Sequence, residues 1–421
     1  MLDLVRFELK KLLVRRTSLI ACAGILVMLC GIMTLNIVQT KTASDTGEVL
    51  NGTAAIAHQK EKAAAHEGVL TVERVQDEVA AYKALAFSKV DPADVAGLSD
   101  DAAYALMIQA YDEDEFRAIY DSYYAYLLSP WKVGALEPYQ VAAQLDDGAA
   151  DGFYEAVAGK LQRTLDNDMG GTWTYSDAER AYWTEKQGGV GEPLAYGYAG
   201  GWSDVLACLG FFAFAMVAVC IALTPVFSGE YQDRTDAVLL SSRYGRSKLV
   251  AAKIVAALAF ATAYFALATL IIMGAALAFF GAEGGDLPVQ VLSLSIPYDL
   301  TMAEATWTAV GIAYLMTLGL AGLTLLLSSK LRSQLAIFAA CAALIFLTGM
   351  IPSGDNAVLL HALYLFPING LNDQVLFNSL VSYPVGSFVI DLIGLLACVY
   401  ALVLAACVPL AARAFRRHQV V

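Results

Sequence analysis

A cluster of charged and hydroxyl side chains follows one of the apolar runs of this sequence. It comprises Glu230, Asp233, Arg234, Thr235, Arg243, Arg246 and Lys248. Carboxylates, guanidinium groups and an ammonium group so close together favour ion pairing and hydrogen bonding with another protein surface. Such pairs fix register and orientation more than they add affinity. The competing interpretation is a solvated loop with no further role.

The residue patterns of hydrolytic enzymes are absent from the sequence. Gly159-Lys160 precedes Leu161 and lacks the glycine that a phosphate-binding loop requires five residues earlier. His58, His66, His361 and His418 do not have metal-ligand spacing, and no Gly-x-Ser-x-Gly or His-Glu-x-x-His pattern occurs. We therefore predict a protein that is not an enzyme, with no catalytic residues, no metal and no cofactor of its own.

One carboxylate, Asp391, lies about one turn inside the last apolar run and is a candidate intramembrane polar site. Ionisable groups inside a membrane are costly and often functional. Its position near the end of the run also allows contact with water. Because the middles of the apolar runs carry no carboxylate, proton-driven transport is not favoured.

The elements that would position these residues are membrane helices. Hydrophobic residues make up 58% of the chain and its mean hydropathy is +0.57, values typical of membrane proteins. A spanning helix needs about 20 apolar residues. Six runs qualify, at about 18–38, 204–227, 253–281, 306–327, 334–351 and 387–409. We predict an all-α polytopic membrane protein with six transmembrane helices.

The basic residues predict the orientation. Outside residues 39–203 there are 15 Lys and Arg, and six spans place all of them on one side. The positive-inside tendency assigns that side to the cytoplasm, with both termini. Residues 39–203 are then an extracytoplasmic domain between the first two spans, with 27 acidic and 12 basic residues. This acidity favours solubility or attraction of cationic ligands.

The extracytoplasmic domain is predicted to be mainly helical. Helices are expected over Ala54–Val90, Asp100 to about Leu128, Asp151–Leu165 and Ser176–Gln187, with no convincing strand pattern. All seven cysteines lie in the apolar runs, so the domain is expected to fold without disulfides. Residues 352–386 hold two apolar pieces that suit outer re-entrant or interfacial helices.

The first 17 residues predict a cytoplasmic amphipathic helix that lies on the membrane surface. Leu2, Val5, Leu9, Leu12 and Leu13 share one helical face. The basic side chains that would meet anionic membrane lipids are Arg6, Lys10, Lys11, Arg15 and Arg16.

The segment from Glu230 to Lys253 resembles the loop after the second span in permease subunits of ABC-2 type ABC transporters. The matching positions are Glu230, Arg234-Thr235, Leu239-Leu240-Ser241, Arg246-Ser247 and Lys253. The sequence departs from the family pattern in having Arg234 where glycine is usual, and in an inverted Arg-Ser pair. The amphipathic first helix and the six spans fit the same family. The resemblance covers about 250 residues of the membrane part and not residues 39–203.

The resemblance implies a transport subunit without its own ATPase. Residues 1–16 and a cytoplasmic coupling loop at 228–250 would dock on a separate ABC ATPase subunit, which binds ATP and Mg²⁺. The permease would pair with itself or a related chain in a bacterial cell membrane, without contact with nucleic acid. The large insertion after the first span suggests an exporter of a peptide, lipid or antibiotic-like substrate. The alternatives are a receptor or sensor whose acidic outer domain binds a ligand, and a scaffold for envelope machinery.

Overall fold

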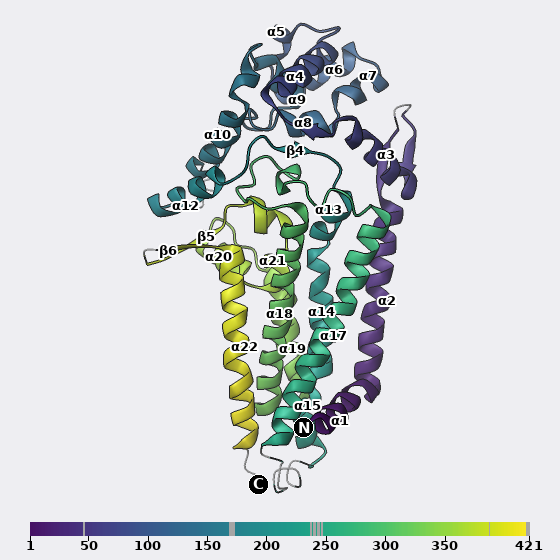
Figure 1. Ribbon diagram of the computed structural model, residues 1–421, viewed down its shortest axis with the longest axis vertical. Coiled ribbons are helices and arrows are strands. Elements are labelled where there is room, and N and C mark those ends of the chain that lie inside the picture. The colour runs from purple at the N-terminus through teal and green to yellow at the C-terminus, as the bar shows by residue number, and fades with distance from the viewer. Residues whose placement is uncertain are drawn as a thin grey trace. The chain divides into compact units, whose positions relative to one another are not determined.

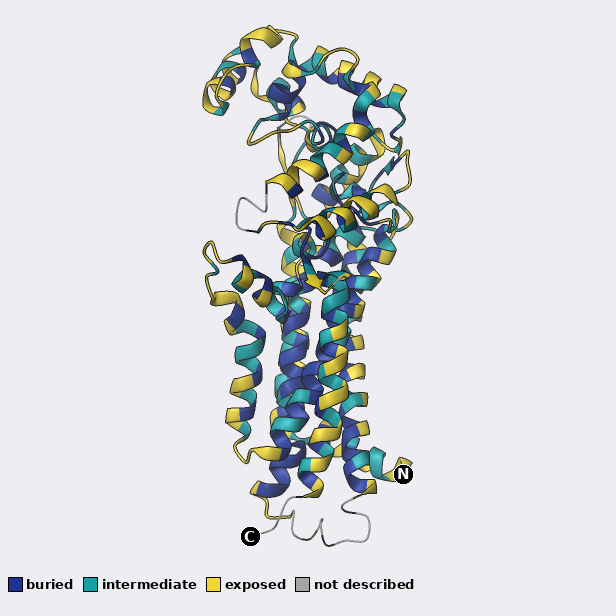
Figure 2. Ribbon diagram, turned by 90° about the vertical axis from the view of Figure 1, so that its left-hand side faces the viewer, coloured by how far each residue is buried: buried dark blue, intermediate teal, exposed yellow. Residues whose placement is uncertain are grey.

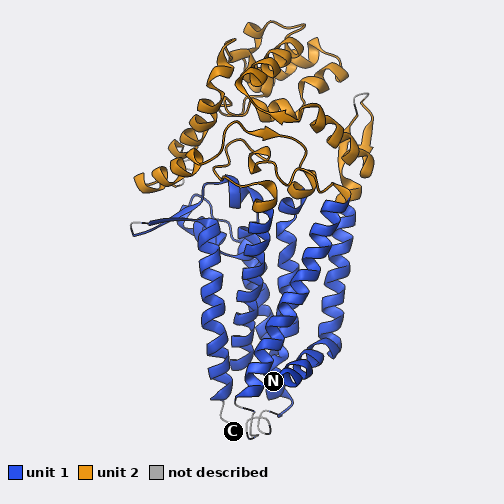
Figure 3. Ribbon diagram, in the orientation of Figure 1, with its two compact units in different colours: residues 1–35, 204–278, 306–421 blue, residues 36–203, 279–305 orange. Residues whose placement is uncertain are grey.

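The computed structural model divides the chain into two compact units (Figure 3). The first unit comprises residues 1–35, 204–278 and 306–421, and the second comprises residues 36–203 and 279–305. The structure describes residues 1–44, 47–167, 173–235, 238, 241, 245, 247–386 and 388–417.

Long apolar helices make up most of the first unit and run side by side (Figure 1). Among the described residues, five helical stretches are long and apolar enough to cross a membrane. They are α2 (Arg16–Gln39), the stretch Leu209–Gln232 that includes α14 (Phe212–Leu223) and α15 (Pro225–Gln232), α17 (Lys248–Phe279), α18 (Met302–Lys330) and α22 (Leu392–Arg416). The prediction of an all-α polytopic membrane protein is confirmed in this sense.

The fifth predicted span, at 334–351, is a shorter apolar helix. It consists of α19 (Gln334–Phe346) continued by the 3-10 turn η4 (Leu347–Met350). At 1.5 Å per residue it is about 25 Å long, a little less than the hydrocarbon thickness of a bilayer. Five of the six predicted spans therefore have full spanning length, and the remaining one, at 334–351, falls just below it.

The last predicted span begins later than expected. Residues 388–391 form β6 (Phe388–Asp391), which pairs antiparallel with β5 (Ser382–Val385) in a hairpin that the sequence did not predict. The helix α22 starts only at Leu392, after this hairpin. The preceding stretch holds the short helices expected there, namely α20 (Ala357–Tyr364), α21 (Pro367–Gly370) and the π turn η5 (Gln374–Asn378).

Burial divides the helices of the first unit into inner and outer ones (Figure 2). In the most apolar part of the stretch Leu209–Gln232, 78% of the residues are buried, whereas in the most apolar parts of α2 and α22 only 22% are buried. Close helix contact depends on small residues: a side chain at Gly319 of α18 would collide with Tyr400 of α22. The exposed faces of α2 and α22 are left for lipid or for another protein chain.

The second unit is a mostly helical domain with two short pairs of antiparallel strands. Its helices are α3 (Thr53–Ala65), α4 (Val72–Ala86), α5 (Pro92–Val95), α6 (Asp100–Ala110), α7 (Glu113–Ile119), α8 (Ser122–Leu127), α9 (Pro138–Gln144), η1 (Ala149–Gly152), α10 (Phe153–Asp166), α12 (Asp177–Gly188) and η3 (Val289–Val291). α13 (Gly200–Ala207) begins in this unit, and the 3-10 turn η2 (Leu209–Phe211) follows it in the first unit. The strands are β1 (Lys41–Ala43), paired with β2 (Val49–Asn51), and β3 (Gly68–Val69), paired with β4 (Ala195–Tyr196).

Two helices expected in this unit are divided into shorter ones by side-chain caps. The stretch Ala54–Val90 is interrupted before Thr71, whose hydroxyl caps α4. Within Asp100–Leu128, Asp112 forms a capping box that starts α7 and Asp121 caps α8. Short polar side chains that accept backbone hydrogen bonds therefore end what composition alone predicts as continuous helices.

Residues 279–305 belong to the second unit, although they lie between the long apolar helices α17 and α18. Leu294 is fully buried in its hydrophobic core with residues such as Tyr82 and Met107. The indole of Trp202 donates to the carbonyl of Ala282 over 3.0 Å. The second unit is therefore completed by a segment from a distant part of the chain.

Candidate functional site

The candidate site begins where α15 ends. Glu230 lies in the last turn of this helix, and Asp233 forms its C-cap. Arg234 follows in the left-handed conformation, with φ at +57°, and the amide of Thr235 donates to the carbonyl of Glu230 over 3.0 Å. This bond is the one that closes a Schellman turn, a common way to end a helix at a residue in the left-handed region. The left-handed position explains why glycine would suit residue 234.

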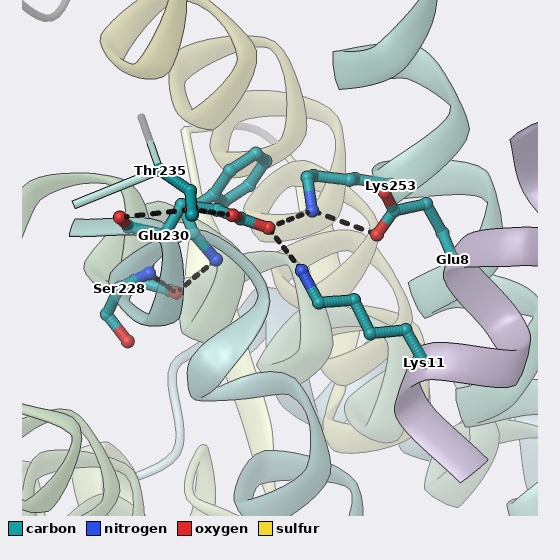
Figure 4. Close-up of polar contacts among 8 residues, drawn as sticks. Glu8, Lys11, Ser228, Glu230, Thr235 and Lys253 are labelled. Atoms are coloured by element: carbon teal, nitrogen blue, oxygen red, sulfur yellow. Dashed lines mark hydrogen bonds and ion pairs between the residues drawn. The ribbon is translucent and has the colours of Figure 1, made fainter. Parts of the chain in front are cut away.

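The turn returns Thr235 to the carboxylate of Glu230 (Figure 4). The Thr235 hydroxyl donates to Glu230 Oε2 over 2.5 Å, and Lys253 Nζ lies 2.8 Å from Glu230 Oε1. Lys11 Nζ of α1 (Leu2–Val14) lies 2.5 Å from the same Oε1 atom. Glu230 is only 4% exposed, so these donors replace water around a buried carboxylate.

Lys253 connects Glu230 to a second carboxylate. Its ammonium group is 2.8 Å from Glu8 Oε2 of α1, and both residues are buried (Figure 4). We call Glu8, Lys11, Glu230 and Lys253 the charge network. Its two carboxylates and two ammonium groups balance in formal charge. Charges buried in this way require their partners, because removing one leaves an uncompensated ion.

A second set of polar contacts lies beside the charge network. Arg15 donates to the Oε1 atom of Gln334 over 3.2 Å, and the amide of Gln334 donates to Gln232 over 2.8 Å. The amide of Gln232 in turn donates to the carbonyl of Arg332 over 2.8 Å. These bonds connect the α1–α2 turn, the end of α15 and the connection between α18 and α19.

The start of α15 is held in place by Ser328 of α18. Its hydroxyl donates to the carbonyl of Thr224 over 2.6 Å and accepts from the amides of Phe227 and Ser228 at 3.0 Å. These are backbone groups of the first turn of α15, where the helix itself supplies no partner. α15 is thereby held to α18 at its start and to α1 and α17 at its end.

The charge network connects elements that lie far apart in the sequence. The charge network joins the first helix of the chain to helices that begin more than 200 residues later. No cluster of three or more potential metal ligands occurs among the residues that the structure describes.

The predicted interface residues divide into two groups. Asp233, Arg234, Thr235 and Lys248 are exposed, whereas Glu230 is buried within the first unit rather than free for a partner. Arg243 and Arg246 lie outside the described residues. Thus Glu230 is an internal ion-pair partner, although the sequence grouped it with surface charges.

The basic residues of the amphipathic helix also differ in their surroundings. Arg6, Lys10 and Arg16 are exposed, but Lys11 and Arg15 contact Glu230 and Gln334. Sequence reasoning missed Glu8, the only buried carboxylate of this helix. The sequence does contain one signal for it: Glu8 lies four residues before Leu12, and so on the same face of the helix as that apolar residue.

Asp391 is the N-cap of α22. Its Oδ1 accepts the backbone amide of Gly394 over 2.9 Å, and the residue is 7% exposed. It was predicted one turn inside the last span. It precedes the helix instead, because the hairpin extends to this residue.

A comparison with models of known protein families identifies the class of protein. A family model described as ABC-2 family transporter protein matches residues 8–384. The chain belongs to the ABC-2 transporter family. No curated protein and no solved structure matched the chain.

Membership in the ABC-2 transporter family makes the chain a membrane permease subunit of an ABC transporter, with ATP hydrolysis in a separate subunit. The matched range contains all four residues of the charge network. It also runs through residues 39–203, so the family likeness is not limited to the membrane part as the sequence had suggested.

Proposed function

We propose that this ABC-2 permease subunit belongs to an exporter in which a separate ATPase drives the helices through the charge network. The observation that carries the proposal is the position of Lys253 between Glu8 and Glu230. The ammonium group joins α17 to two elements at the end of the bundle. A helix used only for anchorage would not need buried charges, which are costly to desolvate.

In this proposal the exposed residues beside the network contact the ATPase. Asp233, Arg234 and Lys248 flank Glu230 and Lys253 in sequence and carry charge at the surface. ATP and Mg²⁺ would bind in the partner chain, and closure of two ATPases would move α15 and α1 in a paired permease. The pairing uses a second copy of the chain or a related one.

The orientation that fits this proposal has α1 in the cytoplasm. The exposed basic residues at that end include Lys248, Lys330 and Arg416, as the positive-inside tendency requires. The acidic residues 39–203 would then be extracytoplasmic in a bacterial cell membrane. The substrate class that we propose is a peptide, a lipid or an antibiotic-like molecule.

One feature of the second unit favours a receptor or sensor as the alternative. A cavity of about 420 Å³ is lined by aromatic and charged side chains, including Tyr120, Tyr123, Tyr196, Lys62 and Asp121. This size lies within the usual range of ligand pockets. Ligand binding to this cavity without any associated ATPase would support a sensor.

Co-purification tests the proposed function. The tagged full-length chain is expected to bring an ABC ATPase with it from its own membrane, and the complex should hydrolyse ATP. Charge reversal at Arg234 and Lys248 should lower the amount of bound ATPase. Arg416→Glu, an exposed change on a different helix of the same unit, is the matched control.

The proposal would be wrong if no ATPase accompanied the chain and the reversed charges left transport unchanged. Equal loss of ATPase in Arg416→Glu would also count against a specific interface, because it would indicate a general effect of surface charge.

A further inference from the structure

A groove of about 310 Å³ lies between α1, α2 and α17 in the first unit. Leucines line it from α1, and both small and large residues, most of them apolar, line it from the two longer helices. Representative lining residues are Leu9 and Leu13 of α1, Cys22 and Ala23 of α2, and Ala259 and Ala263 of α17. The hollow exists because alanine and cysteine stand at positions where larger side chains would fill the space between the helices.

The groove is almost free of polar groups. Two of its lining residues carry hydroxyl groups, Ser18 and Tyr264. The hydroxyl of Tyr264 donates to the carbonyl of Cys22 over 2.8 Å, and Ser18 is buried. Both α2 and α17 are helices of membrane-spanning length and composition. A hydrocarbon chain is therefore the chemical match to the groove, since water would find few hydrogen-bond partners along its walls.

Unpaired basic side chains lie next to the groove. Arg6 and Lys10 each precede a groove leucine by three residues, a spacing that places them on neighbouring positions of the helix surface. Arg16 starts α2. All three are exposed, and no ion pair is found for them with any described residue. Lys11, on another side of α1, is instead neutralised by Glu230.

The groove could be covered by a second copy of the chain or by a phospholipid. The apolar lining and the nearby basic side chains favour one of the two. A second copy of the chain, related by a twofold axis, would present the same surface to itself and bring equal basic residues together. A phospholipid supplies an acyl chain for the groove and a phosphate for the cations. Since the bilayer interior is as apolar as leucine, the headgroup must provide the selectivity.

We propose that this groove binds one acyl chain of an anionic phospholipid, with Arg6, Lys10 and Arg16 holding its headgroup. The bound lipid would support α1 in the position from which Glu8 and Lys11 reach α17 and α15. Membrane composition would then act on the charge network through one defined site, independently of which ATPase or substrate the transporter uses.

Photo-crosslinking tests this site in the full-length chain. The probes are phosphatidylglycerol and phosphatidylcholine with a diazirine on one acyl chain, presented in nanodiscs. Phosphatidylglycerol should label peptides of residues 9–26 and 259–267, and phosphatidylcholine should label them several-fold less. The variant with Arg6→Gln, Lys10→Gln and Arg16→Gln should lose this preference, because each replacement removes an attraction to the anionic headgroup.

A groove-filling variant separates the acyl-chain site from general lipid contact. Ala23→Leu with Ala263→Leu should reduce labelling of the groove peptides, whereas Ala405→Leu, an exposed change on α22, should not. Hydrogen exchange of residues 2–14 should be slower in phosphatidylglycerol than in phosphatidylcholine, and the filled variant should remove that difference.

Equal labelling by the two lipids would overturn the headgroup assignment. Labelling unchanged by the filled groove would overturn the acyl-chain site. If Leu19→Cys, at the exposed rim, forms a disulfide between two chains in the membrane, the groove is a subunit interface and the proposal fails.

Discussion

Lys253 Nζ lies 2.8 Å from Glu8 Oε2 although the two residues are 245 positions apart in the chain. The same ammonium group lies 2.8 Å from Glu230 Oε1. One buried lysine of α17 thus holds together the first helix and the end of α15. Because Lys253 is 2% exposed, the three side chains depend on one another for charge compensation.

Replacing Lys253 by methionine should destabilise the protein strongly. The change keeps an apolar stem of similar length but leaves Glu8 buried with no cation at its side. We expect the free energy of unfolding to fall by about 3–5 kcal/mol, the range for removing one partner of a buried ion pair. Thermal unfolding of the purified full-length chain, followed by tryptophan fluorescence, would measure it.

A double-mutant cycle tests the assignment to the ion pair. Glu8→Gln in the Lys253→Met background removes the orphaned charge and should restore part of the stability, giving a coupling energy of about 1 kcal/mol or more. Strictly additive losses would show that Glu8 and Lys253 do not interact in the folded protein.

Replacing Arg234 by glycine should stabilise the turn after α15. Arg234 has a φ of +57°, a conformation that costs a residue with a side chain about 1 kcal/mol and costs glycine little. Arg234→Gly is therefore expected to raise the unfolding temperature, whereas Arg234→Ala removes the same charge without relieving the strain. A gain in both variants would instead assign the effect to the guanidinium group.

Leu294→Ala should destabilise the second unit. Leu294 is fully buried in the core of that unit, although it lies in a segment between two long apolar helices. The lost packing and the cavity left behind should cost about 3 kcal/mol. Leu292→Ala, two residues earlier and only half-buried, is the matched control. Hydrogen exchange of residues 72–86 in the full-length chain would compare the two, and equal effects would contradict the assignment.

The sequence predicts apolar helices well because their signal is local. Runs of about 20 apolar residues need no knowledge of tertiary contacts, and five of them appear as long helices. Ser176 illustrates the same point in the second unit: its capping box with Glu179 starts α12 one residue from the expected helix start. By contrast, the β5–β6 hairpin spans only 382–391 and has no clear alternating pattern.

The charge network could not be predicted in the same way. Glu8 and Lys253 are ordinary members of charged, helix-flanking segments, and only the fold shows that they meet. The sequence identifies Glu230 as part of the motif that resembles the family. It groups Glu230 with surface charges, because spacing along a chain does not reveal which side of a short helix faces the protein. Leu294 was missed for a similar reason, since its partners in the buried core lie about 100 residues or more earlier in the chain.

Asp391 should act as a helix cap and not as a charge for transport. Its Oδ1 accepts from the amide of Gly394, and asparagine offers an equivalent acceptor without the charge. Asp391→Asn is expected to leave stability nearly unchanged, whereas Asp391→Ala should cost about 1 kcal/mol. Unfolding temperature and transport activity of both variants would be measured together. If the asparagine variant folds normally but no longer transports, the charge itself is required, and the carboxylate would belong to the transport pathway.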